Sequence, residues 1–367
     1  MKRRDFLTGL GAGAVATSLS GCAQKCPQSA AGVASKSRAT FNWKMVTTWP
    51  PNFPGLGTGA NYLARAIEDM SAGQITVKVF AAGELVPAFE AFDAVSQGTA
   101  QLGHSASYYW KGKSAAAQLF SAVPFGMNAQ EMTAWILHGD AMELWKEVYE
   151  PFNIIPAPAG HTGVQMGGWF NKEINSVADL RGLKMRIPGL GGEVLKRAGG
   201  TPVSMPGSEI FTSLQTGNID ATEWTGPYND LAFGLHQVGK YYYYPGWHEP
   251  NTMLECIINR DAFNELPDNL QSIVLRASDA AAQNMLAEYT ARNHIALKTL
   301  KEEHNVQLRP FPPDVLQRLR TLSKEILAEI AASDELFARV YKHYREFQQN
   351  VSAWHDISEK AYYLTTN

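Results

Sequence analysis

Two apolar segments, FNWKMVTTW over residues 41–49 and QITVKVF over residues 74–80, enclose an amphipathic segment that runs from Ala60 to Met70. The first segment alternates, becomes β-branched near its end and is stopped by two prolines, so we expect a strand. A glycine-rich stretch at 55–59 opens the helix, and the second apolar segment predicts another strand. A strand, a helix and a strand in this order are typical of an α/β fold.

The same alternation continues along the chain. We expect further helices at about 87–97, 129–148 and 191–198, a helical turn at 177–180, and strands at about 101–104, 164–170 and 184–187. Beyond Pro267 the pattern turns strongly helical, with apolar-periodic runs over 270–303 and 313–344 and an aromatic helix at about 351–363.

This order of elements predicts a two-lobed α/β protein with hinge strands, a ligand cleft between the lobes and a helical C-terminal region. The first lobe is expected to take residues 40–160 and about 250–285. The second takes 161–249 with part of the C-terminal helices, and the helical region takes 286–367. The terminal helices can pack on their own chain or form a homodimer, and both interpretations stay open.

The first residues, MKRRDFL, place two arginines before a short apolar run, which is typical of a twin-arginine-like export signal. The apolar run over 10–19 is far shorter than the roughly 20 residues of a membrane-spanning helix. LSGC at 19–22 resembles a bacterial lipobox, so we expect a signal peptide over 1–21 and a lipid on Cys22 that holds the protein at the membrane. We expect residues 22–39 to form a flexible tether, and we expect the protein to be periplasmic.

Composition limits the possible partners. Besides Cys22, the chain has only Cys26 and Cys256, which implies no disulfide framework. The formal net charge of −3 becomes about −5 when the three basic residues and one acidic residue of the signal are removed, and nothing indicates a nucleic-acid partner. A mildly acidic protein that binds an anion must supply positive charge locally.

Motifs for enzymatic chemistry are missing from the sequence. The glycines at 55–59 lack both the Lys-Ser/Thr ending and the spacing of a nucleotide-binding loop. Neither a Gly-x-Ser-x-Gly nor a His-Glu-x-x-His pattern occurs, and the nine histidines are scattered. The sequence therefore gives no support for an enzyme, which stays an open alternative, and we predict no catalytic residues.

Three charged side chains stand in informative surroundings. Arg186, in LKMRIPG at 183–189, either extends to solvent or points into a cleft, where its planar fork would match a carboxylate. Glu223 stands beside a tryptophan, and Glu249 follows a run of tyrosines. A carboxylate among aromatic side chains is costly unless it is paired or holds a cation, although an exposed strand face would also accommodate it.

Three segments together resemble the substrate-binding subunits of tripartite ATP-independent periplasmic (TRAP) transporters: KMRIPG at 184–189, IDATEWTGPY at 219–228 and YYPGWHEP at 243–250. The similarity extends to residues 48–60, 108–110 and 123–127. Within the family, the chain is similar to the branch that binds 2-oxo acids and related hydroxy acids with a cation. The resemblance implies capture of a small monocarboxylate such as pyruvate or lactate and its delivery to membrane permease subunits.

The resemblance also implies roles for individual residues. Arg186 is expected to pair with the substrate carboxylate. The expected metal ligands are the side-chain oxygen of Gln165, the carboxylates of Glu223 and Glu249, and the main-chain oxygen of Trp224. Ligation by oxygen alone suits Na⁺ or Ca²⁺. The side chains expected to line the substrate pocket are Gln165, Trp49, Tyr108, Tyr109 and Trp224.

Two alternatives remain at this point. A cation-dependent lyase or aldolase would turn over pyruvate or lactate, with a Glu223→Gln variant as its control. A sensing lipoprotein would bind the same ligand without transport, and neighbouring genes for two permease subunits would argue against it.

Overall fold

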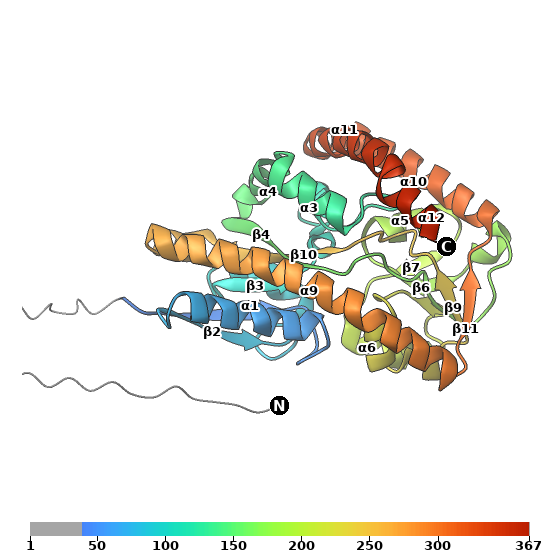
Figure 1. The fold of residues 1–367 in the computed structure, drawn as a ribbon, viewed down its shortest axis with the longest axis horizontal. Coiled ribbons are helices and arrows are strands. Elements are labelled where there is room, and N and C mark those ends of the chain that lie inside the picture. Colours follow the sequence, from blue (N-terminus) through green and yellow to red (C-terminus); the bar gives the residue numbers. More distant parts are fainter. Residues whose placement is uncertain (1–38, 367) are drawn as a thin grey trace, which may run out of the picture. The chain divides into compact units, whose positions relative to one another are not determined.

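Residues 39–366 are described by the computed structural model of the chain (Figure 1). The predicted export signal, Cys22 and all but the end of the predicted tether lie outside these residues. Among the described helices, none is both long enough and apolar enough to cross a membrane.

The first sheet starts from the strand, helix and strand expected near the N-terminus. β1 (Phe41–Thr47) and β2 (Ile75–Phe80) run parallel, and α1 (Leu56–Met70) connects them. Leu63 and Ile67, four residues apart on α1, are fully buried. One apolar face of the helix therefore packs against the core, as the amphipathic pattern predicts.

Three more strands complete this sheet in the order β2-β1-β3-β10-β4. β3 (Leu102–Ser105) is parallel to β1, whereas β10 (Met253–Asn259) is antiparallel to both β3 and β4 (Ile154–His161). All seven residues of β10 are buried. A strand from far along the chain thus lies inside the sheet, between two strands that precede residue 162.

The helices near the first sheet are short. They are η1 (Ala88–Glu90), α2 (Ala91–Ser96), η2 (Ser107–Trp110), η3 (Ala115–Phe120), α3 (Ala129–His138), α4 (Ala141–Tyr149), η4 (Glu150–Phe152) and α8 (Arg260–Asn264). The helix expected at 129–148 is two helices, because Asp140 adopts a left-handed φ of 59° between them.

The second sheet has the order β11-β9-β5-β8-β6-β7. Its strands are β5 (Gly168–Phe170), β6 (Lys184–Arg186), β7 (Thr201–Val203), β8 (Ala221–Thr222), β9 (Tyr241–Tyr244) and β11 (Gln307–Pro310). The helices between them are η5 (Val177–Leu180), α5 (Gly189–Arg197), α6 (Gly207–Gln215), α7 (Pro227–Ala232) and η6 (Leu235–Gln237). Two sheets with helices around them confirm the α/β class.

Two connections carry the chain between the sheets: residues 162–167 join β4 to β5, and residues 245–252 join β9 to β10. The strand predicted over 164–170 is wrong for its first four residues. There the N–H of Gln165 donates to the carbonyl oxygen of Glu249, and the N–H of Met166 donates to that of Thr225. Because successive donors bond to different loops, this connection forms no ladder.

The long helices lie at the C-terminal end of the chain. α9 (Asp268–Glu302) contacts α1 and β4 beside the first sheet and α7 beside the second, and Figure 1 shows it running past both. The run predicted over 313–344 is divided into α10 (Pro313–Ser333) and α11 (Glu335–Ile357). The break falls at Asp334, whose side chain accepts a hydrogen bond from the N–H of Phe337 and caps α11.

The aromatic helix expected at about 351–363 is also divided differently. α11 continues to Ile357, and α12 (Glu359–Thr366) begins after it. The apolar pattern is periodic through these boundaries, so the predicted ends depended on caps that the pattern does not reveal.

Stacked aromatic rings hold the helices of the first part together. Phe120 lies between Trp135 and Trp145, with ring centroids 5.4 Å and 5.2 Å apart. Each such pair contributes about 0.5–1.5 kcal/mol beyond the burial of its area. The lobe boundaries expected from the sequence stay a prediction, because the described residues from Ala39 onward form one compact unit.

Candidate functional site

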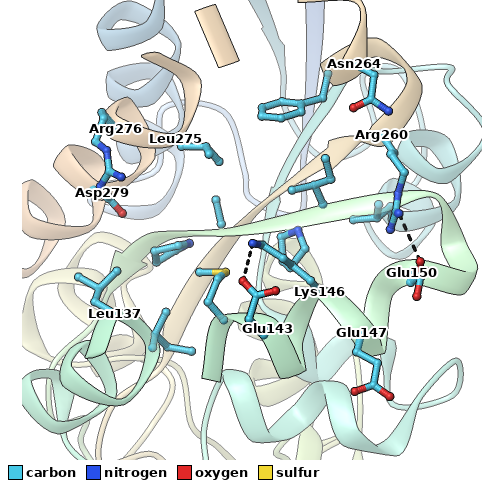
Figure 2. A pocket seen from close by; sticks show the side chains of 18 residues that line it. Leu137, Glu143, Lys146, Glu147, Glu150, Arg260, Asn264, Leu275, Arg276 and Asp279 are labelled. Carbon is cyan, nitrogen blue, oxygen red and sulfur yellow. Dashed lines mark hydrogen bonds and ion pairs between the residues drawn. The ribbon is translucent and has the colours of Figure 1, made fainter. Parts of the chain in front are cut away.

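A large cavity lies away from every predicted site residue. It has a volume of about 770 Å³ and is lined by residues of α4, β4, α8 and α9 (Figure 2). Cationic side chains at its edge are already paired: Lys146 with Glu143, Arg260 with Glu150, and Arg276 with Asp279. Its open, charge-paired rim offers no unpaired charge to a small carboxylate.

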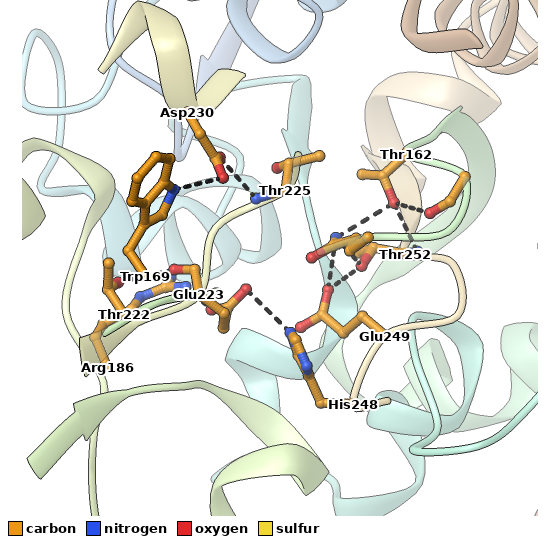
Figure 3. Close-up of polar contacts among 12 residues, drawn as sticks. Thr162, Trp169, Arg186, Thr222, Glu223, Thr225, Asp230, His248, Glu249 and Thr252 are labelled. Carbon is orange, nitrogen blue, oxygen red and sulfur yellow. Dashed lines mark hydrogen bonds and ion pairs between the residues drawn. The ribbon is translucent and has the colours of Figure 1, made fainter. Parts of the chain in front are cut away.

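The predicted ionic residues instead meet where the second sheet faces the two connections. Arg186 ends β6, and Glu223 follows β8 directly. Arg186 lies opposite Thr222 in the parallel pairing of these strands, which places Glu223 beside it. Gln165 and Glu249 come from the two connections, so four separate segments supply the cluster seen in Figure 3.

Arg186 points into the protein rather than into solvent, with 1% of its side chain exposed. It forms an ion pair and hydrogen bond with Glu223, and it donates to the hydroxyl of Tyr109 at 3.2 Å. Its guanidinium also lies over the ring of Trp224, 5.1 Å from the centroid. Burial acts to lower the pKa of Arg186, but Glu223 and nearby groups raise it overall, so this side chain stays charged.

Gln165 has an oxygen without a partner. Its Nε2 donates at 2.9 Å both to Glu249 Oε2 and to Thr252 Oγ1. Those bonds fix the orientation of the amide, and its buried Oε1 accepts no hydrogen bond from any described residue. A buried acceptor of this kind is costly unless a donor or a cation meets it.

Glu249 is a second buried carboxylate close to Glu223. It accepts a hydrogen bond from the hydroxyl of Thr252 as well as from Gln165. Burial, and then the negative charge of Glu223, raise the pKa of Glu249. Two buried carboxylates together with an unpaired amide oxygen form a donor set that fits a hard cation such as Na⁺ or Ca²⁺.

His248 is a member of this cluster that sequence reasoning missed. Donor atoms of Glu223, His248 and Glu249 lie within 4.8 Å of one another, and all three residues are buried. The Nε2 of His248 is 3.5 Å from Glu223 Oε2, and neither ring nitrogen makes a hydrogen bond with a described residue. No local pattern in the sequence marked this histidine, because its partner Glu223 lies far from it along the chain.

The predicted aromatic residues form a wall beside the charges, since Trp224 and Tyr109 both contact Arg186. Trp49 follows the end of β1. Its ring centroid lies 6.4 Å from that of Tyr109 and 6.5 Å from that of Trp224. Together with Tyr108 and Gln165, these three aromatic side chains line a small cavity. Its volume is only about 10 Å³, the room that one water molecule needs, so an organic acid enters only if the walls separate.

A buried histidine fixes the orientation of Trp49. The indole N–H of Trp49 donates to Nδ1 of His104 at 2.8 Å, and Nε2 of His104 lies 3.3 Å from the carbonyl oxygen of Ala159. His104 must therefore accept at Nδ1 and carry its proton on Nε2. Burial lowers the pKa of His104 to about 4, which keeps this neutral tautomer in place at neutral pH.

Asp230 supports the part of the site that the second sheet supplies. It accepts hydrogen bonds from Trp169 Nε1 at 3.0 Å, from the hydroxyl of Tyr242 at 2.6 Å and from the main-chain N–H of Thr225 at 3.4 Å. Burial raises the pKa of Asp230 to about 7. The strand end that carries Glu223 and Trp224 is thus attached to the core of the second sheet.

Two α/β parts, joined by two connections that carry a buried ionic site, define the class of two-lobed solute-binding proteins. The chain belongs to the DctP family, described as bacterial extracellular solute-binding protein, family 7, whose model matches residues 45–334. Members of this family bind solutes for TRAP transport and are not enzymes, so the lyase or aldolase alternative is not supported.

Relatives of known function agree with this assignment. The chain is 41% identical over 363 residues to the monocarboxylate 2-oxoacid-binding periplasmic protein of Nostoc sp. (strain PCC 7120), which covers 99% of this chain and 98% of that protein. A TRAP solute-binding protein of Pseudoalteromonas atlantica, solved with sodium and pyruvate, has 44% identity and a TM-score of 0.87, covering 89% of this chain and 100% of that one. A counterpart from Colwellia psychrerythraea, solved with calcium and pyruvate, has 43% identity and a TM-score of 0.85, covering 89% and 99%.

Proposed function

We propose that this protein captures a small 2-oxo or 2-hydroxy monocarboxylate, such as pyruvate or lactate, together with Na⁺ or Ca²⁺, and delivers it to the membrane subunits of a TRAP transporter. The observation that carries the proposal is the buried Oε1 of Gln165, which accepts no hydrogen bond from the described residues, while the Nε2 of the same amide donates to Glu249. The 2-oxoacid and pyruvate named for the relatives support the substrate class.

The charges of the site support a cation. Arg186 supplies one positive charge, and Glu223 and Glu249 supply one negative charge each when ionised. Adding a monocarboxylate would leave two negative charges in excess within a buried volume, which is strongly unfavourable. One Na⁺ reduces this excess to one, and one Ca²⁺ reduces it to zero.

The residues have distinct roles in this proposal. The Gln165 oxygen, the carboxylates of Glu223 and Glu249, and the main-chain oxygen of Trp224 would hold the cation, which supplies positive charge to oxygens of the acid. Arg186 binds the carboxylate through its planar fork. Since Arg186 pairs with Glu223 here, the incoming carboxylate takes over part of that pairing while the cation compensates Glu223.

The experiment is calorimetric titration of pyruvate into protein freed of bound ligand, in buffers containing Na⁺, Ca²⁺, or neither cation with a chelator. We expect binding only when a cation is present. Arg186→Ala removes two charge-assisted hydrogen bonds to the carboxylate and should weaken binding by about 100-fold or more. Glu249→Gln should shift the cation concentration required for half-maximal binding.

Arg276→Ala is a matched control, because Arg276 is 75% exposed and, among the described residues, forms an ion pair with Asp279 alone, at 2.7 Å. Its affinity for pyruvate should equal that of the wild type. Unchanged affinity in Arg186→Ala, or full affinity without any cation, would contradict the proposed site. A test of uptake in cells lacking the permease subunits separates transport from sensing, because a sensor would respond without them.

We also propose that the mature protein is a periplasmic lipoprotein anchored through Cys22. The support is the lipobox-like LSGC at 19–22 behind a short apolar run. A Cys22→Ser variant should lose incorporation of a labelled fatty acid and move from the membrane fraction to the soluble periplasmic fraction. Equal labelling of the variant and the wild type would refute lipidation at this residue.

We further propose a homodimer formed through the C-terminal helices. Five large apolar or aromatic side chains of α11 and α12 are exposed to solvent: Trp354 by 59%, Ile357 by 74%, Tyr362 by 65%, Tyr363 by 62% and Leu364 by 76%. A cluster of this kind favours a protein contact. Light scattering should give a dimer for the wild type and a monomer for Trp354→Glu with Leu364→Glu, whereas a monomeric wild type excludes the interface.

A further inference from the structure

A third cavity, the α10–α11 pocket, lies between α10, α11 and residues 123–126. Its volume is about 130 Å³, roughly ten times the space that one water molecule needs. α10 packs against α5 and η5 of the second sheet, whereas α11 packs against α3, α4 and η3 of the first. The two helices lie side by side in Figure 1, so the pocket joins structure from both sheets.

The charges that line this pocket are all positive. Arg320 and Lys324 stand one turn apart on α10 and share a helix face, and Arg345 approaches from α11. No acidic residue belongs to the pocket lining. None of these three cations forms an ion pair with another described residue, unlike Lys146, Arg260 and Arg276 around the larger cavity.

Two other polar side chains of the pocket are already bonded to its wall. Ser323 and Gln348 direct their hydrogen bonds to the carbonyl oxygens of Pro124 and Phe125, which occupies those acceptors. The Nε of Arg345 is buried and has no hydrogen-bond partner among the described residues, although its Nη1 donates to Tyr341 at 3.2 Å. A buried guanidinium nitrogen without an acceptor is unfavourable unless an anion meets it.

The guanidinium of Arg320 is held in position by an aromatic ring. It lies over Phe125, 4.3 Å from the ring centroid, so it is fixed at the wall of the pocket. Three like charges that line one small pocket repel one another unless a counter-charge lies between them. The arrangement thus has the features of an anion site: fixed planar donors, no competing carboxylate and room for one small polyatomic ion.

We propose that the α10–α11 pocket binds a small, multiply charged oxyanion with phosphate-like chemistry, separate from the solute site. Three positive charges favour an anion of charge −2 or greater over a monocarboxylate. Inorganic phosphate and the phosphate of an anionic lipid headgroup share this chemistry.

The pocket is also linked to the solute site. The N–H of Phe125 donates to the carbonyl oxygen of Trp247 at 2.8 Å, and the two rings stack with centroids 5.9 Å apart. Trp247 precedes His248 and Glu249 in the connection that carries the predicted cation ligand. Since an oxyanion held by Arg320 and Arg345 joins α10 to α11, its affinity and that of the solute should influence each other reciprocally.

The test is calorimetric titration of inorganic phosphate into the mature chain carrying Cys22→Ser. We expect saturable binding at one site that weakens as NaCl is raised, because exposed charges are screened. The double variant Arg320→Ala with Lys324→Ala should lower the affinity about 10-fold or more. Both residues are exposed on one helix face, so circular dichroism should show that the variant remains folded.

The control Lys146→Ala with Arg276→Ala removes the same charge elsewhere and should bind phosphate like the wild type. Vesicles of phosphatidylglycerol provide the second arm: binding lost in the Arg320 and Lys324 variant, with no response to free phosphate, would assign the oxyanion to a headgroup. The proposal is overturned if neither probe binds saturably, or if the control loses as much affinity as the double variant. It is also overturned if phosphate binding disappears in Arg186→Lys but persists in the double variant, since the anion would then occupy the solute site.

Discussion

Single buried polar residues decide how the walls of the solute site are held. His104 is an example, because it accepts the indole N–H of Trp49 and donates onward to Ala159. Replacing His104 by Phe leaves that buried N–H without an acceptor, which costs about 1–3 kcal/mol of stability. Trp49 should then turn from its place in the wall.

We therefore expect His104→Phe to lower both the melting temperature and the affinity for pyruvate, while His104→Gln, which can still accept at its amide oxygen, restores much of both. Calorimetry on the two variants checks this. Equal losses in Phe and Gln would show that His104 acts only through packing.

Glu255 makes a pH-dependent contribution to stability. It is fully buried in β10, accepts hydrogen bonds from Trp110 at 2.5 Å and Tyr149 at 2.7 Å, and burial raises its pKa from 4.5 to about 7. The folded protein therefore binds this proton more tightly than the unfolded chain. The contribution is fully present below pH 4.5 and is lost as the pH rises through about 7.

The variant Glu255→Gln lacks this titrating group. The free energy of unfolding of the wild type minus that of the variant should therefore decrease from pH 5 to pH 7.5, by up to about 1.4 kcal/mol per pH unit. Urea unfolding at several pH values measures it. His104 and His161, whose pKa values burial lowers to about 4, are common to both proteins and cancel in the difference. A constant difference across this range would exclude titration of Glu255.

Single buried polar residues also explain why only part of the site could be predicted from the sequence. Arg186, Glu223 and Glu249 stand in segments with a strong family resemblance, and Gln165 was carried over with them. His248 and Asp230 gave no periodic signal, because one polar residue in a loop or a short helix does not change an apolar pattern. Glu255 was detectable in principle, since a carboxylate within the apolar run MLECIIN requires a buried partner.

At the level of elements, the regular strands and helices followed the sequence pattern, and the connections did not. Residues 164–167 carry an apolar pattern that predicts a strand, yet their hydrogen bonds go to three different segments. Contacts between segments far apart in the sequence determine this geometry, and local strand propensity does not reveal them. The same holds for β10, which pairs with β4 about 100 residues earlier in the chain and with β3 about 150 residues earlier.

Gly168 is the point where the first connection enters the second sheet. Its φ is +115°, and a Cβ there would lie 2.4 Å from the carbonyl oxygen of Thr222. Gly168→Ala should therefore displace the strand end that precedes Glu223, at a cost of about 1–3 kcal/mol. We expect weaker pyruvate binding together with a lower melting temperature.

Gly182→Ala is the comparison, since Gly182 also has a positive φ but has nothing near its missing Cβ. It should lose some stability and keep its affinity for pyruvate. If Gly168→Ala binds pyruvate normally, the position of this strand end does not control the site.

On the scale of the whole molecule, the cavity of about 10 Å³ requires that capture and release involve movement. Both connections between the sheets contain site residues, Gln165 in one and Glu249 in the other. Separating the sheets must therefore change the distance between ligands of the proposed cation. We propose that the lobes predicted from the sequence move as two bodies about these connections.

The two tryptophans of the wall give this movement an optical signal. Trp49 follows a strand of the first sheet and Trp224 follows a strand of the second, with ring centroids 6.5 Å apart at 80°. Any opening takes both indoles from buried surroundings toward water, so their emission should shift to longer wavelength. Pyruvate with its cation should reverse the shift, and Trp49→Phe should reduce the response. The binding event of this protein can thus be followed by its own fluorescence in a stopped-flow instrument, without a label.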